Sequence, residues 1–159
     1  MMNLCCDVLR ELKGKTLVTA ESCTGGGIGA ALTNVPGMSS VFKGGIVSYC
    51  NELKTKLLGV DTDLLETYGA VSAPVAEAMA AGAMKKLDAD IAVSVTGLAG
   101  PDGDEFGNPV GTVYIGYCDK YLCISEKHLF SGDRDEVRRQ ATEAALMLVL
   151  KRNNAEKIC

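Results

Sequence analysis

The sequence has no tryptophan, a single histidine, 5% aromatic residues and no run of basic side chains. A nucleic-acid groove needs a basic stripe, usually with stacking rings, so these shortages argue against nucleic acid as a partner. The net charge is −4, and an anionic ligand must therefore be held by a local cluster of donors. Hydrophobic residues make up 47% of the chain, yet no apolar run approaches the length of a membrane span.

The sequence also lacks the patterns of metal sites and of secretion. None of its seven cysteines forms a C-x-x-C pair, and His128 is the only histidine. We therefore expect no Cys/His metal site and predict reduced, mostly buried thiols. The first residues do not resemble a signal peptide, which favours a cytoplasmic protein. The 159 residues fit one domain, 1–159, long enough to bury a core without disulfides or metal.

Periodicity predicts helices alternating with strands up to Gly97. A hairpin with a two-residue turn at Asp119 and Lys120 follows, and then a helix that starts at Asp133. The fold class is therefore α/β: a three-layer α/β/α sandwich with a mixed, mostly parallel sheet and a C-terminal β-hairpin plus helix. The expected strands before the hairpin are 16–20, 41–50 and 91–97, and the expected helices are 4–12, 25–37, 52–59, one near 64–65, and 73–87.

Local signals place the helix starts. Asn51 can cap the helix 52–59, and Asp61 or Thr62 can cap the one near 64–65. Ser72, with Pro74 in the first turn, opens the helix 73–87. Asp133, with Glu136 three residues later, resembles a capping box.

Ser22 lies where an apolar strand meets a glycine-rich helix start. A serine there can be an N-cap, which stabilises a helix by about 1 kcal/mol. It can also be a nucleophile, because the NH groups of Cys23, Thr24 and Gly25 are available to a developing oxyanion. The two roles are compatible. Cys23 is an alternative nucleophile, since helix N-termini lower thiol pKa values.

A serine nucleophile needs a base at neutral pH. The pattern around His128 indicates an ordinary strand residue of the hairpin. Lys54 is therefore the remaining candidate for the base. Lys54 lies one turn into the helix after the strand that ends near Tyr49, where the helix dipole lowers the pKa of a cation. Spacing alone favours the interpretation of Lys54 as a solvated surface lysine like Lys56. It likewise favours Tyr49 as a core ring rather than a proton relay.

Two further segments can bind a ligand. The long loop 98–111 is either a binding loop or a plain surface loop. We interpret its acidic residues, Asp102, Asp104 and Glu105, as solvated charges. Arg134 and Arg138 lie one helical turn apart and form either a phosphate clamp or two exposed arginines paired with carboxylates.

Taken together, these segments resemble the C-terminal domain of the CinA proteins, a family whose stand-alone members are nicotinamide-nucleotide amidohydrolases. The resemblance rests on TLVTAESCTGG, VPGMSSVFKGGIVSYCNELK, LLGV, YGAVS, VTGLAGPDG, PVGTVY and FSGDRDEVRRQA. It implies hydrolysis of nicotinamide mononucleotide to nicotinate mononucleotide and ammonia, with no metal or organic cofactor. It also implies a three-layer fold that is commonly a homo-oligomer.

By motif, the family's catalytic serine, tyrosine and lysine fall on Ser22, Tyr49 and Lys54. Two departures stand out: Cys50 replaces the serine of the usual Y-S-N-E-x-K pattern, and the loop after Gly100 is shorter and more acidic. The alternatives are an amidohydrolase for another small amide, a non-catalytic nucleotide-binding module, and a structural or partner-binding domain. The expected substrate-binding residues are Cys23, Thr24, Gly25, Gly26, Thr96, Gly97, Gly100, Arg134 and Arg138.

Overall fold

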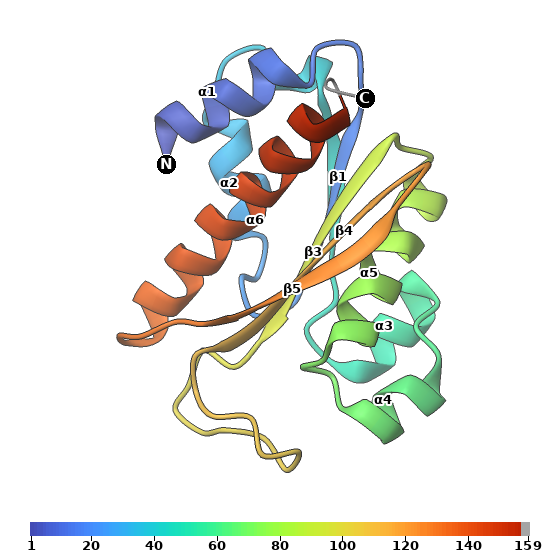
Figure 1. Ribbon diagram of the computed structural model, residues 1–159, viewed down its shortest axis with the longest axis vertical. Helices are drawn as coiled ribbons and strands as arrows, with labels where there is room; N and C mark the ends of the chain where they lie inside the picture. Colours follow the sequence, from blue (N-terminus) through green and yellow to red (C-terminus); the bar gives the residue numbers. More distant parts are fainter. Residues whose placement is uncertain (157–159) are drawn as a thin grey trace.

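A five-stranded sheet separates two layers of helices in the computed structural model, which describes residues 1–156 (Figure 1). The strand order is β2-β1-β3-β4-β5. β1 pairs in parallel with β2 and β3, and the β3–β4 and β4–β5 pairs are antiparallel. Only β4 therefore runs against the others, and the predicted mixed, mostly parallel sheet is confirmed. The strands are β1 Leu17–Glu21, β2 Phe42–Val47, β3 Ile91–Gly97, β4 Thr112–Asp119 and β5 Cys123–Leu129.

The helices divide evenly between the two faces of the sheet (Figure 1). One face carries α1 (Met2–Glu11), α2 (Gly27–Thr33) and α6 (Arg134–Glu156), and the other carries α3 (Asn51–Leu58), α4 (Thr62–Tyr68) and α5 (Ala73–Leu87). A short 3-10 turn, η1, spans Met38–Ser40. Each helical layer packs its own apolar cluster against the sheet. β1 is buried along its whole length and β3 along nearly all of it, as expected for apolar strands covered on both sides.

Two of the predicted side-chain caps are confirmed. Asp133 and Glu136 form a reciprocal capping box, in which each main-chain NH donates to the other's carboxylate at 2.9 Å. Asp61 accepts the NH of Asp63 at 3.0 Å.

The capping prediction for Asn51 is wrong. Asn51 is the first residue of α3 rather than its cap, a position taken by Cys50. Ser72 opens α5 as predicted: it is the N-cap residue, with Pro74 in the first turn, and its hydroxyl donates to the carbonyl of Gly69.

The hairpin forms as predicted, with its turn one residue further on. Asp119 donates its NH to the carbonyl of Leu122 at 2.9 Å, so the two central residues are Lys120 and Tyr121. Cys118 and Cys123 face each other across the hairpin and are joined as a disulfide, so the prediction of reduced thiols is wrong for this pair.

The other described cysteines are free, and they divide evenly between the core and the surface. Cys5 and Cys23 are buried, whereas Cys6 and Cys50 are exposed. Cys159 lies outside the described residues.

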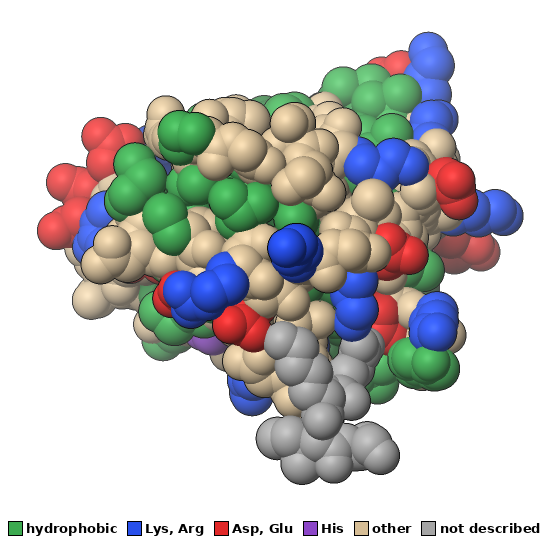
Figure 2. All heavy atoms as spheres, turned by 90° about the horizontal axis from the view of Figure 1, so that it is seen from above, with side chains coloured by type: hydrophobic (Ala, Val, Ile, Leu, Met, Phe, Trp, Pro, Cys, Tyr) green, Lys and Arg blue, Asp and Glu red, His purple; other side chains and the backbone are tan. Residues whose placement is uncertain are grey.

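The molecular surface carries charges of both signs. Figure 2 views the end of the molecule at the top of Figure 1, where Lys and Arg side chains are interspersed with Asp and Glu, without a broad basic area. Within residues 1–156, no helix has the length and apolar character needed to cross a membrane.

Candidate active site

The segments that follow β1, β2 and β3 meet at one edge of the sheet, because these neighbouring strands are parallel. They enclose a cavity of about 260 Å³. Residues from α6 and from the connection between α4 and α5 complete its wall. The lining residues are Ser22, Cys23, Tyr49, Asn51, Lys54, Ala70, Val71, Thr96, Gly97, Leu98, Ala99, Gly100, Asp102 and Arg134.

Ser22 and Lys54 are in direct contact inside this cavity. The Nζ atom of Lys54 lies 3.1 Å from the Oγ atom of Ser22. It also lies 3.0 Å from the carbonyl oxygen of Ser48 and 3.4 Å from that of Tyr49. The exposed fraction is 7% for Ser22 and 1% for Lys54, so the hydroxyl and the amine meet away from bulk water.

Burial lowers the pKa of Lys54 below its ordinary value of 10.5, against smaller opposing effects of Cys50 and Cys23. No carboxylate forms an ion pair with this amine in the described part of the chain. The interpretation of Lys54 as a solvated surface lysine is therefore wrong. The main cause of the lowered pKa is desolvation, rather than the helix dipole invoked from the sequence.

Tyr49 stands at the rim of the cavity with 60% of its surface exposed, so the interpretation as a core ring is wrong. Its hydroxyl accepts a hydrogen bond from Nη2 of Arg134 at 2.9 Å. Nη1 of the same guanidinium donates to the carbonyl of Gly100. Arg134 thus links the rim tyrosine to the loop 98–111, while Tyr49 reaches Lys54 only through its main-chain carbonyl.

The turn between β1 and α2 differs from the predicted helix start. α2 begins at Gly27 with Gly26 as its N-cap, so Ser22 is not a cap. The NH of Gly25 donates to the carbonyl of Ser22 at 3.0 Å, which removes it from the predicted set of free donors. The NH groups of Cys23 and Thr24 have no oxygen acceptor within residues 1–156.

The thiol of Cys23 is a poor competitor for the role of nucleophile. Burial raises its pKa to about 11, against smaller lowering effects that include Lys54 and Arg138. The thiol therefore stays protonated at neutral pH, and the thiolate is the reactive form of cysteine. Among the groups that touch Lys54, the hydroxyl of Ser22 is the remaining nucleophile.

The structure brings together part of the predicted binding set. Cys23, Thr96, Gly97, Gly100 and Arg134 line the cavity. The remaining predicted residues, Thr24, Gly25, Gly26 and Arg138, lie outside its lining.

The guanidinium of Arg138 is already engaged. It donates to the carbonyls of Cys23 and Thr24, both at 3.1 Å, and approaches the carboxylate of Asp135 at 3.6 Å. Arg138 therefore holds the turn that follows Ser22 and does not line the cavity.

Several residues that line the cavity were not predicted from the sequence as part of the site, among them Asn51, Val71 and Leu98. Val71 belongs to the segment YGAVS, whose resemblance to the family was the one signal available. Asp102 also lines the cavity, and its side chain is exposed to solvent, as predicted for a solvated charge.

Asp104 organises the loop 98–111 from within. Its carboxylate accepts the NH groups of Phe106 and Asn108 and the side-chain amide of Asn108. Asn108 in turn donates to the carbonyl of Val71. The interpretation of Asp104 as a solvated charge is therefore wrong, and the loop is tied to the wall of the cavity.

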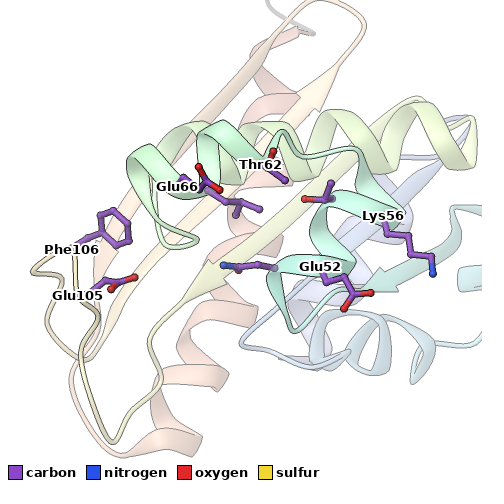
Figure 3. A pocket seen from close by; sticks show the side chains of 9 residues that line it. Glu52, Lys56, Thr62, Glu66, Glu105 and Phe106 are labelled. Atoms are coloured by element: carbon purple, nitrogen blue, oxygen red, sulfur yellow. The ribbon is translucent and has the colours of Figure 1, made fainter.

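A larger cavity, of about 620 Å³, lies beside the first and shares Asn51 with it. Figure 3 shows Glu105 and Phe106 approaching from one side, with Glu66 and Thr62 of α4 and Glu52 and Lys56 of α3 along the remainder. This groove contains neither Ser22 nor Lys54. The smaller cavity is therefore the one with a nucleophile and a base.

Comparison with known sequences identifies the family. The family model described as "CinA C-terminal domain" matches residues 2–153. Nicotinamide-nucleotide amidohydrolase PncC of Escherichia coli K12 is 47% identical over 137 residues, which cover 86% of this chain and 83% of that protein. A CinA-like protein of Geobacter sp. strain M21 is 53% identical over 131 residues, but these make up only 31% of its length.

Solved structures show the same fold. The competence damage-inducible protein A of Klebsiella pneumoniae MGH 78578 superposes with a TM-score of 0.92 at 34% identity and covers 94% of each chain. A competence/damage inducible protein of Agrobacterium tumefaciens gives a TM-score of 0.91 at 36% identity, covering 94% of this chain and 93% of that one.

Proposed function

This chain belongs to the CinA C-terminal domain family, and on that premise we propose that it hydrolyses the carboxamide of nicotinamide mononucleotide to nicotinate mononucleotide and ammonia. The substrate is supported by the identity to PncC over most of both chains. The chemistry is supported chiefly by the 3.1 Å contact between Lys54 Nζ and Ser22 Oγ in a buried cavity.

The carbonyls around Lys54 orient its amine. A neutral amine has two N–H groups and one lone pair. The N–H groups donate to the carbonyl oxygens of Ser48 and Tyr49, which directs the lone pair toward the hydroxyl of Ser22. Lys54 takes the hydroxyl proton as the Ser22 oxygen attacks the carboxamide carbon.

The resulting oxyanion needs donors, and the NH groups of Cys23 and Thr24 are the ones left free. In acyl transfer each such donor stabilises the transition state by about 3 kcal/mol. The Lys54 ammonium then protonates the departing nitrogen, the C–N bond breaks, and ammonia leaves an ester on Ser22. Water attacks that ester with Lys54 again as the base, which releases the carboxylate and restores the hydroxyl.

Arg134 is our candidate for the contact with the substrate phosphate, because it lies at the mouth of the cavity and its charge has no carboxylate partner in residues 1–156. The loop segments at Thr96, Gly97 and Gly100 surround the space left for the ring and the ribose.

The direct test is release of ammonia and nicotinate mononucleotide from nicotinamide mononucleotide by the purified protein. We expect Ser22→Ala and Lys54→Met each to lower kcat by about a thousandfold or more, because the two groups act as a unit. Lys56→Met, at an exposed position of the same helix, is the matched control and keeps the wild-type rate. Undiminished turnover by Ser22→Ala would refute the mechanism.

The same assay separates the alternatives. Binding of the mononucleotide without ammonia release would identify a nucleotide-binding module. Faster turnover of another carboxamide in direct competition would move the assignment to a different small-amide substrate.

A further inference from the structure

Glu21 is a buried carboxylate that the mechanism above does not use. It is the last residue of β1, stands directly before Ser22 and has 1% of its surface exposed. Its Oε2 atom accepts from the hydroxyl of Thr24 at 2.7 Å and from the NH groups of Gly26 and Ile28 at 3.1 and 3.0 Å. Its Oε1 atom accepts the NH of Gly29 at 3.0 Å. One side chain thus satisfies four donors of the turn and of the first residues of α2.

A second set of contacts holds the same turn. Arg138 donates to the carbonyls of Cys23 and Thr24, and the NH of Gly25 donates to the carbonyl of Ser22. Between these contacts, the NH groups of Cys23 and Thr24 are the ones without an oxygen acceptor in the described residues. Gly25 and Gly26 have φ values of 61° and 96°, and glycines without support populate many conformations.

We infer that Glu21 is a positioning residue: it holds the turn 22–26 in the one conformation that leaves the NH groups of Cys23 and Thr24, directly after Ser22 in the chain, without an oxygen acceptor and available to the oxyanion. The inference rests on the proposed function for the natural substrate, but it concerns only the reactivity of Ser22. By occupying the NH groups of Gly26, Ile28 and Gly29, the carboxylate also keeps the start of α2 from attracting the substrate phosphate or the oxyanion to the wrong donors.

Glu21→Gln tests this role with almost no change of volume. Both carboxylate oxygens of Glu21 accept hydrogen bonds, and in glutamine one of them is replaced by an NH2 group. In either orientation of the amide, this NH2 group faces main-chain or hydroxyl donors that it cannot satisfy. We expect the turn to loosen while the sheet and α2 stay folded. The predicted result is a fall of about a hundredfold in kcat for nicotinamide mononucleotide with KM within about twofold, as for loss of an oxyanion donor.

A second readout does not depend on the natural substrate. An alkyl fluorophosphonate reacts by forming a bond between Ser22 Oγ and phosphorus, while the P–F bond breaks, fluoride leaves and the hydroxyl proton passes to Lys54. The phosphoryl oxygen then takes the place of the oxyanion. Mass spectrometry gives the rate constant for labelling of Ser22, which we expect to fall about a hundredfold in Glu21→Gln.

The matched control is Asn153→Ala. Asn153 is also fully buried and hydrogen-bonded to a main-chain carbonyl, that of Glu11, but it lies near the far end of α6. The substitution Asn153→Ala should lower the melting temperature without changing the labelling rate of the folded protein. If Glu21→Gln does not fold, Thr24→Val removes a single contact to Glu21 and should slow labelling several-fold.

Labelling of Glu21→Gln, or of Thr24→Val where the first does not fold, at the wild-type rate would overturn the inference, and so would a wild-type protein that the fluorophosphonate does not label. A wild-type protein that is labelled at Ser22 but releases no ammonia from nicotinamide mononucleotide would refute the proposed substrate. In that case the effect of Glu21→Gln on labelling still decides the role of Glu21.

Discussion

At the scale of single residues, the burial of Lys54 opposes folding in its charged form. An ammonium loses its hydration when it is buried, and no carboxylate compensates it in the described chain. Folding therefore favours the neutral amine, which is the form a general base requires. The stability cost and the catalytic capacity have the same physical origin.

The burial of the Lys54 amine predicts how the stability of the protein depends on pH. Because the pKa of Lys54 is lower in the folded protein than its ordinary value of 10.5, the unfolded chain binds more protons between the two values. The free energy of unfolding that Lys54 contributes therefore rises with pH through this window. We expect Lys54→Met to be more stable than the wild type below the folded pKa, by a margin that shrinks as the pH rises toward 10.5.

Urea denaturation of both proteins at about pH 6, 8 and 9 measures this margin. Lys56→Met, whose amine is exposed, serves as the control and should follow the wild-type profile. A constant margin between Lys54→Met and the wild type would show that Lys54 titrates alike in both states. The value of kcat/KM should also rise with pH as the amine loses its proton.

At the scale of elements, α5 holds α3 in place through a close approach at Gly82. A β-carbon at this position would collide with the carbonyl oxygen of Leu58. α3 carries Lys54 one turn before Leu58, so the distance between the two helices sets where the amine lies. Glycine inside a helix lowers stability by about 1 kcal/mol relative to alanine. At position 82 the close contact between the two helices explains why glycine is present in spite of this cost.

We therefore expect Gly82→Ala to destabilise the protein by about 1–3 kcal/mol, although it improves helix propensity, because the added methyl group must push the helices apart. Activity should fall as Lys54 moves away from Ser22. Ala81→Gly, at an exposed neighbouring position, should cost about 1 kcal/mol through helix propensity and retain activity. Urea denaturation and the ammonia assay measure both effects, and a stabilised Gly82→Ala would contradict this account.

Local sequence patterns located most elements and missed several of their ends. The capping box at Asp133 and Glu136 involves residues three apart, and it forms as predicted. The start of α2 was misplaced because its N-cap is Gly26, which has no side chain. Glu21, from before the turn, accepts the NH groups of Ile28 and Gly29 that a capping side chain would have taken. The cysteines at 118 and 123 were assigned as free thiols because their pairing depends on the register of the hairpin.

At the scale of the whole molecule, the cavity joins parts of the chain that lie on both faces of the sheet. Tyr49 precedes α3 on one face and Arg134 opens α6 on the other, and their side chains meet across the mouth. A ligand that fills the cavity therefore bridges both helical layers, and its binding should stabilise the fold as a unit.

This linkage predicts a thermal shift in the inactive variant Ser22→Ala. At a concentration of nicotinamide mononucleotide about 100 times its Kd, the free energy of unfolding should rise by about 2.7 kcal/mol. For a chain of this size, that corresponds to a rise of about 5–10 °C in the melting temperature. Nicotinamide riboside, which lacks the phosphate, is the control and should give a smaller rise at equal concentration. No shift with the mononucleotide would argue for a structural or partner-binding domain.

Residues close together in the chain were enough to predict the order of helices and strands and the mixed sheet with its closing hairpin. Motifs that resemble a known family identified Ser22 and Lys54 as candidates. The burial of Lys54 against Ser22, 32 positions away, and the contact of Arg138 with the turn at Cys23, 115 positions away, became known only from the three-dimensional fold. Desolvation and hydrogen bonding depend on which distant segments pack together, and a local pattern carries no record of that packing.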